Sequence, residues 1–145
     1  MKNMPPSELK TTPKAKRGRP EGKIQETYVA SVKTLPARYI PRYTDKNGRD
    51  QPLLFQHLLG SAGALNGEGE VWCTPGIPDT VTFFIDKDRR PGVLYIEFKA
   101  GRNKPTHDQA AIIAALQSLG LNIHAEVHWS AESAFNSLLS HIGIG

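Results

Sequence analysis

The second half of the chain shows the most regular pattern of hydrophobic and polar positions. Segments 79–85 (DTVTFFI) and 93–99 (VLYIEFK) are rich in β-branched and aromatic residues, and a turn sequence, DKDRRPG, joins them. They predict two antiparallel strands of a hairpin. The pattern then predicts a helix over 107–119, a strand over 122–129 and a last helix over 131–141. Because the strand at 122–129 is reached through a helix, we expect it to run parallel to the strand before it.

The first half of the chain has one clear element and several weaker ones. Apolar residues recur at helical spacing over 24–35 and Pro36 follows them, so we expect a helix that begins near Glu21. Between this helix and the hairpin, the pattern predicts an extended piece over 38–43, turns over 44–52, a short helix over 53–60 and a Gly-rich loop over 61–70.

Together, these elements predict an α/β fold, in which helices flank a mixed β-sheet. The chain has 145 residues, which is enough for one domain with its own core. We expect this domain to span 21–145 and to follow a disordered basic arm over 1–20. No apolar run approaches the ~20 residues of a membrane-spanning helix, and the N-terminus has no apolar signal segment. These features predict a cytoplasmic protein without a membrane partner.

Positive charge is concentrated at the N-terminus. The chain has a formal net charge of +4, and most of its Lys and Arg residues lie within 1–50. A basic segment of this kind favours a polyanionic partner, most often nucleic acid. Within it, Arg17-Gly18-Arg19-Pro20, preceded by Lys16, resembles an AT-hook, whose two arginines enter the minor groove of A·T-rich DNA. The alternative is a solvated tail that only aids solubility.

Three charged residues meet at one end of the predicted hairpin. Side chains alternate along a strand, so Glu97 and Lys99 point to the same face of an otherwise apolar segment. Asp79 opens the preceding strand and adds a third charge at that end. Buried charges are costly unless they are paired or bind a ligand, and paired carboxylates suit a divalent cation. The structural alternative is an ion pair of Glu97 and Lys99 on an exposed edge strand.

These charged residues also lie within a recognisable spacing. The segments GIPD at 76–79 and YIEFKA at 95–100 contain a Pro-Asp pair and, after a short hairpin, a Glu-Phe-Lys run. This spacing resembles the PD-(D/E)XK motif of a nuclease superfamily. With Gln109 at the start of the next helix, it resembles the VRR-NUC family within that superfamily, and EGKIQ at 21–25 is similar to the family's first helix. The resemblance implies a restriction-endonuclease-like core of α-β-β-β-α-β type.

The resemblance implies a role for each matching residue. Asp79, Glu97 and the backbone carbonyl of Phe98 would bind Mg²⁺ or Mn²⁺ as the cofactor. Lys99 would orient or activate the attacking water and help to neutralise the scissile phosphate. Gln109 would support the site from the next helix. The segment THDQ that ends at Gln109 also fits a capping box, and the two roles can coexist.

Four further residues are candidates for completing the site. Glu21, at the start of the first helix, would add a metal ligand directly or through water, and Glu26 is the alternative for that role. Both would otherwise be solvated helix residues. Arg102 and Lys104, in the loop after the hairpin, would contact the DNA backbone together with the basic arm.

The aromatic residues outside this motif are given structural roles. His124 and His128 would share one face of a strand but lie ~13 Å apart, which is too far for one metal ion. We interpret them as surface or groove residues. Trp72 and Trp129 are interpreted as core or interface residues.

The function that these features predict is a metal-dependent DNA endonuclease that hydrolyses phosphodiester bonds. Stand-alone members of the family resemble Holliday-junction resolvases and often work as homodimers, and the small size favours selection of branched DNA structures over long sequences. A non-catalytic DNA-binding module and a sequence-specific restriction-type nuclease are the alternatives. Loss of Asp79 would abolish cleavage by a nuclease but leave its DNA binding, which separates it from a binding module.

Overall fold

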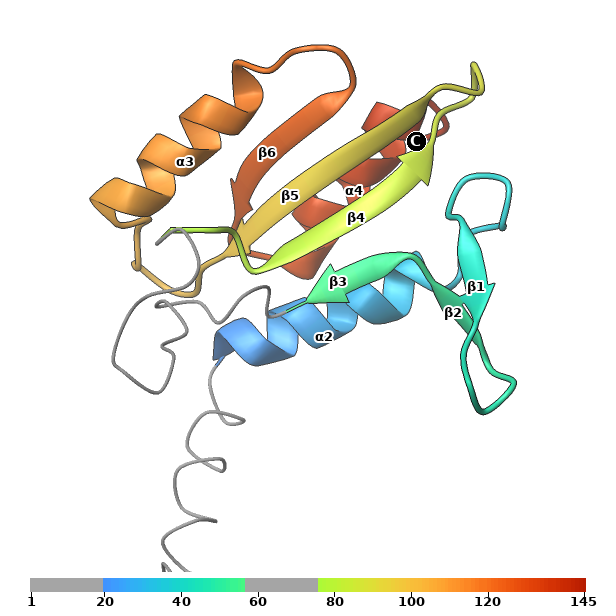
Figure 1. The fold of residues 1–145 in the computed structure, drawn as a ribbon. Coiled ribbons are helices and arrows are strands. Elements are labelled where there is room, and N and C mark those ends of the chain that lie inside the picture. The colour runs from blue at the N-terminus through green and yellow to red at the C-terminus, as the bar shows by residue number, and fades with distance from the viewer. Residues whose placement is uncertain (1–19, 57–75) are drawn as a thin grey trace, which may run out of the picture.

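A four-stranded mixed β-sheet with helices on both faces forms the centre of the fold (Figure 1). The structure, a computed structural model, describes residues 20–56 and 76–145. Its elements in chain order are α2 (Pro20–Val32), β1 (Arg42–Thr44), β2 (Asp50–Pro52), β3 (Leu54–Gln56), β4 (Thr80–Ile85), β5 (Pro91–Phe98), α3 (His107–Gln117), β6 (Ile123–His128) and α4 (Ala131–Ile142). The sheet has the order β3-β4-β5-β6, and β1 and β2 form a separate small hairpin. The described residues thus form a mixed α/β fold.

The hydrophobic core lies between the sheet and the helices α2 and α4. Leu94, Ile96 and Phe98 alternate along β5 and are fully buried on this face, as the period of a strand requires. Apolar side chains from the two helices belong to the same cluster, among them Tyr28, Val32, Leu138 and Ile142. On the other face, α3 packs against β6. The intervening β5 residues, including Glu97, therefore point towards the face that carries α3.

The structure confirms the predicted elements of the second half. β4 and β5 form the expected antiparallel hairpin, and β6 pairs with β5 in parallel after the crossover through α3. The last helix, α4, begins after Ser130, whose side chain accepts a hydrogen bond from the Ser133 amide. These elements were predictable because each one carries its own period of apolar residues.

The prediction of a short helix at 53–60 is wrong where the structure describes that segment. Leu54–Gln56 forms the strand β3, which pairs antiparallel with β4, and 57–60 lies outside the described residues. The apolar spacing of LLFQHLL suits a helix locally, but pairing with the free edge of β4 decides the conformation. Of the extended piece predicted at 38–43, only the last two residues belong to a strand, β1.

The first helix and the segments on either side of it differ in part from the prediction. α2 ends at Val32 rather than near Leu35, and turn residues lead from it to Pro36. Pro20, predicted as the last residue of the arm, is the first residue of α2. The rest of the predicted arm, including Lys16, Arg17 and Arg19, lies outside the described residues, as do the predicted Gly-rich loop and Trp72. Within 20–56 and 76–145, no helix is both long and apolar enough to cross a membrane.

Candidate active site

Asp79 and Glu97 lie side by side at the end of the hairpin where α3 begins. The register pairs Thr80 with Ile96, which places Asp79, the residue before β4, opposite Glu97. The Phe98 amide donates a hydrogen bond of 3.2 Å to Asp79 Oδ2. This bond ties the Asp79 carboxylate to the backbone of the strand that carries Glu97.

Glu97 is a buried carboxylate with one occupied and one free oxygen. Its side chain is 3% exposed. Its Oε2 atom accepts a hydrogen bond of 3.0 Å from Gln109 Nε2 and lies 3.4 Å from the ammonium nitrogen of Lys99. Its Oε1 atom is buried and has no hydrogen-bond partner among the described residues. A buried oxygen without a partner is costly unless a ligand completes it.

The electrostatics of the pair favour a bound cation. Burial, and then the charge of Asp79, raise the pKa of Glu97 to about 7, while Lys99 acts in the opposite direction. Burial also raises the pKa of Asp79, although the hydrogen bond from the Phe98 amide opposes this shift. The two carboxylates repel each other when both are ionised. A proton shared between them, through which Glu97 lowers the pKa of Asp79, or a divalent cation would remove that repulsion.

The residues present fit a hard metal ion. Glu97 offers the free Oε1, Asp79 supplies a second carboxylate, and the Phe98 carbonyl follows directly in the chain. No group of three or more His, Cys, Asp or Glu side chains within 20–56 and 76–145 could hold a metal. Protein oxygens would therefore provide only part of the coordination shell. Mg²⁺ usually binds in this way, through one or two carboxylates together with water and substrate oxygens.

Gln109 connects the start of α3 to the buried carboxylate. Its amide oxygen accepts a hydrogen bond of 2.9 Å from the Thr106 backbone, and its backbone amide donates one of 3.2 Å to Thr106 Oγ1. The predicted capping box is thus confirmed. The amide nitrogen of the same side chain bonds Glu97. One residue both begins the helix and orients the carboxylate.

The segment that leads to Asp79 touches the same helix. Gly76 has a φ of +90°, a conformation that side chains disfavour. A Cβ atom at this position would lie 2.7 Å from the backbone carbonyl of Asp108. Only glycine allows the chain to pass this close to the start of α3. The close approach positions the strand entry that carries Asp79.

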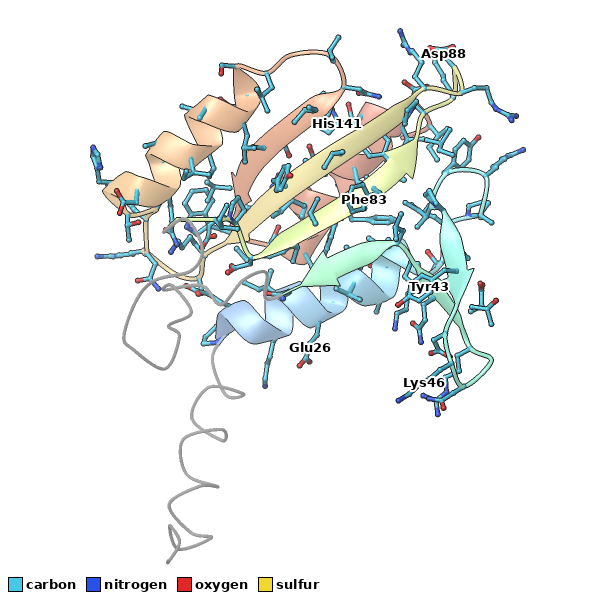
Figure 2. All side chains as sticks on the ribbon, viewed as in Figure 1. Glu26, Tyr43, Lys46, Phe83, Asp88 and His141 are labelled. Carbon is cyan, nitrogen blue, oxygen red and sulfur yellow. The ribbon has the colours of Figure 1, made fainter. Side chains whose placement is uncertain are left out.

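The structure places Glu21, and not Glu26, beside the two carboxylates. The charge of Glu21 contributes to the raised pKa values of both Asp79 and Glu97. Its Oε2 atom accepts a hydrogen bond of 3.2 Å from the side-chain amide of Asn103. Glu26 is exposed and extends from the outer side of α2 (Figure 2).

A loop with two exposed cations borders the site. Arg102 and Lys104 are both exposed in the segment between β5 and α3. A cleft of about 430 Å³ lies beside them and is lined by Pro20, Glu21 and residues 100–103. The loop therefore brings positive charge next to Glu21 at the edge of the carboxylate pair.

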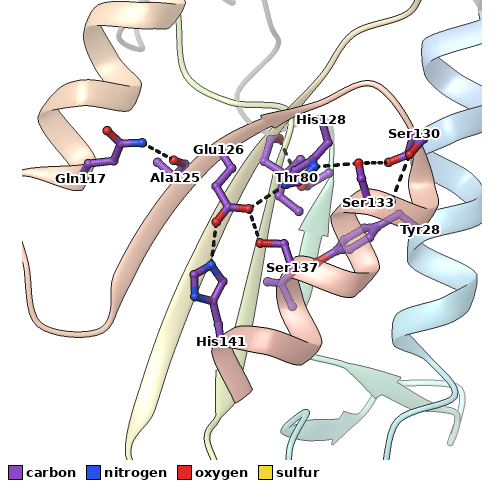
Figure 3. Close-up of polar contacts among 12 residues, drawn as sticks. Tyr28, Thr80, Gln117, Ala125, Glu126, His128, Ser130, Ser133, Ser137 and His141 are labelled. Carbon is purple, nitrogen blue, oxygen red and sulfur yellow. Dashed lines mark hydrogen bonds and ion pairs between the residues drawn. The ribbon is translucent and has the colours of Figure 1, made fainter. Parts of the chain in front are cut away.

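Sequence reasoning missed a polar cluster on the opposite face of the sheet. Glu126 forms hydrogen bonds of 2.7 Å to His128, 2.6 Å to His141 and 2.6 Å to Ser137 (Figure 3). The ring of His124 stacks on that of His141 with centroids 3.7 Å apart. The interpretation of His124 and His128 as surface or groove residues is therefore wrong, since both are half-buried in a network that ties β6 to α4. Three polar residues alternating along 124–128 were the available signal.

Comparison with known proteins gives no match at the level of families, curated proteins or solved structures.

Proposed function

We propose that the chain is a metal-dependent DNA endonuclease with a restriction-endonuclease-like core, related to the VRR-NUC family of the PD-(D/E)XK superfamily. One observation carries this proposal. Glu97 is buried beside Asp79 and Lys99, is oriented by Gln109, and keeps one oxygen free. A structural ion pair would need only Lys99, and it would not need a second carboxylate that raises the pKa of Glu97.

Each residue has a defined task in phosphodiester hydrolysis. Asp79 and Glu97 would hold Mg²⁺ or Mn²⁺, which supplies Lewis-acid stabilisation of the phosphate and a more acidic bound water. Lys99 is 12% exposed and its ammonium nitrogen lies 3.4 Å from Glu97 Oε2, so the ion pair holds the ammonium group in position at the site. It would orient the attacking water and stabilise the negative charge that develops on the phosphate. Gln109 keeps Glu97 in place through the hydrogen bond from its amide.

The proposed substrate is DNA, with branched structures preferred. Arg102 and Lys104 lie next to the site and would contact phosphates, and the basic arm would raise affinity without reading sequence. Cutting both strands of a junction requires two sites, which favours a homodimer. We place this activity in the cytoplasm.

A cleavage assay tests the proposal. Labelled four-way junction, flap and linear duplex DNA are incubated with the protein and Mg²⁺ or Mn²⁺, with and without a chelator. We expect metal-dependent cleavage by the wild type and none by Asp79→Ala. Asp88→Asn is the matched control, because Asp88 is an exposed carboxylate in the turn at the other end of the hairpin (Figure 2). If no substrate is cut while all the proteins bind DNA equally, the catalytic proposal fails and a DNA-binding module remains.

A further inference from the structure

Trp129 presents an exposed indole ring close to the candidate active site. It follows β6 directly, and 45% of its surface is exposed, which contradicts the core interpretation. Nucleic-acid bases stack on exposed aromatic rings, so an exposed indole beside a phosphodiester site offers a surface for such a contact. The ring is also held in place, because its Nε1 atom donates a hydrogen bond of 2.8 Å to the Asn103 carbonyl.

Two short connections link Trp129 to the carboxylates. The Lys99 amide donates a hydrogen bond of 3.0 Å to the carbonyl of His128, the residue before Trp129. Asn103, whose carbonyl holds the indole, donates its side-chain amide to Glu21. The tryptophan therefore lies at the same edge of the sheet as the site and does not depend on a distant part of the fold for its position.

The loop that holds the indole also carries the exposed cations. Arg102 and Lys104 flank Asn103 in the chain. An aromatic face beside a cationic strip is the arrangement by which proteins bind single-stranded nucleic acid, because bases stack on the ring and phosphates contact the cations.

We propose that Trp129 is a stacking platform for an unpaired base of the DNA substrate, with Arg102 and Lys104 on the neighbouring phosphates. This inference rests on the proposed nuclease function and names its substrate class more closely. The DNA would have an unpaired nucleotide beside the scissile bond, as at a flap, a frayed end or a branch point. Fully paired duplex would lack the base that the ring accepts.

Binding measured without metal tests the platform separately from catalysis. Fluorescence anisotropy of labelled single-stranded DNA and of a duplex of equal length is recorded in EDTA. We expect Trp129→Ala to weaken single-strand binding about tenfold, as loss of one stacked base does. Duplex binding should change less than threefold. Tyr43→Ala is the matched control, since Tyr43 is 52% exposed on the small β1–β2 hairpin (Figure 2).

A conservative variant separates stacking from support of the loop. Trp129→Phe keeps an aromatic face but cannot donate to Asn103, so we expect it to retain most of the single-strand affinity. Equal losses in Trp129→Phe and Trp129→Ala would overturn the proposal, because the hydrogen bond would then matter and the ring would not. Unchanged binding by Trp129→Ala would also overturn it.

A spectroscopic measurement reports on the ring directly. The chain has two tryptophans, so Trp72→Phe leaves Trp129 as the source of indole fluorescence. Stacking of a base should quench this fluorescence when single-stranded DNA is added, and absence of quenching on saturation would contradict the platform. If the wild type binds single strands through Trp129 but cuts no DNA, the nuclease proposal falls and the platform stands. If the wild type cuts DNA and Trp129→Ala binds single strands as the wild type does, the platform falls and the nuclease proposal stands.

Discussion

At the residue scale, Glu97 combines burial, a neighbouring charge and a free oxygen. Its pKa of about 7, compared with an ordinary value of 4.5, connects site chemistry to the stability of the fold. As the pH rises from 4.5 to 7, the unfolded chain loses the proton of this carboxyl while the folded chain retains it. Unfolding becomes more favourable over that range, and the loss of stability is complete above pH 7.

Removing the ionisable group at position 97 should remove this dependence on pH. In metal-free buffer, Glu97→Gln should gain stability relative to the wild type as the pH rises from 4.5 to 8, because glutamine does not ionise. We expect a relative gain of about 2–3 kcal/mol, because the pKa of this buried carboxyl rises from 4.5 to about 7 and each pKa unit corresponds to about 1.4 kcal/mol. Urea unfolding at several pH values measures it. A difference between the two proteins that does not vary with pH would contradict the raised pKa.

Glu126 is a half-buried acceptor of a different kind. Burial acts to raise its pKa, but hydrogen bonds from His128, His141 and Ser137 outweigh this effect and hold the pKa well below its ordinary value. The stabilisation is therefore present at neutral pH and is lost as the pH falls through and below the ordinary range of a glutamate. The cluster joins β6 to α4 and is separate from the proposed chemistry.

We therefore expect Glu126→Gln to destabilise the fold by about 2–3 kcal/mol at pH 7, since charged hydrogen bonds are lost and their donors stay half-buried. Thermal or urea unfolding measures the change. The control is Glu132→Gln. Glu132 is an exposed carboxylate in the first turn of α4, and its substitution should alter stability by less than about 0.5 kcal/mol. Equal effects of the two substitutions would show that the cluster contributes nothing.

At the element scale, the site depends on how the entry to β4 passes the start of α3. Gly76 makes this passage possible through a positive φ and a close backbone approach. Gly76→Ala should cost about 2–4 kcal/mol, because it adds a steric contact to conformational strain. It should also reduce cleavage, since the segment that carries Asp79 would shift.

Gly48→Ala is the matched control for the backbone strain alone. Gly48 has a φ of +78°, but an added Cβ would meet nothing within 4 Å. We expect it to cost about 1–2 kcal/mol and to leave cleavage unchanged. If both alanine variants have the same stability and activity, the contact with α3 does not position the site.

The elements also show what the sequence could predict. The hairpin of β4 and β5, the parallel β6 and the three helices follow from local periods of apolar residues. β3 and the β1–β2 hairpin could not be predicted, because three-residue strands carry no period and depend on partners elsewhere in the chain. In the candidate site, the spacing of Asp79, Glu97 and Lys99 was sufficient to predict that these three side chains lie close together. The choice between Glu21 and Glu26 required the packing of α2 against the sheet.

At the scale of the whole molecule, the two faces of the sheet have different tasks. The face covered by α2 and α4 holds the core and the Glu126 cluster. The face that carries α3 holds Glu97 and Gln109, with the cationic loop and Trp129 at its edge. Stability and proposed chemistry are thus carried largely by separate residues. Variants of the site should consequently fold, which makes the activity testable.

If Asp79, Glu97 and Lys99 form the site of DNA hydrolysis, loss of the Lys99 charge must slow the chemical step, and single-turnover cleavage by Lys99→Met measures this. Methionine keeps the apolar stem of the side chain and removes the charge, while Gln109 still holds Glu97. With Mg²⁺ and the preferred DNA from the cleavage assay, we expect a rate about 10²–10³-fold below that of the wild type, with DNA affinity changed less than threefold. A wild-type cleavage rate in Lys99→Met would show that this site does not hydrolyse DNA.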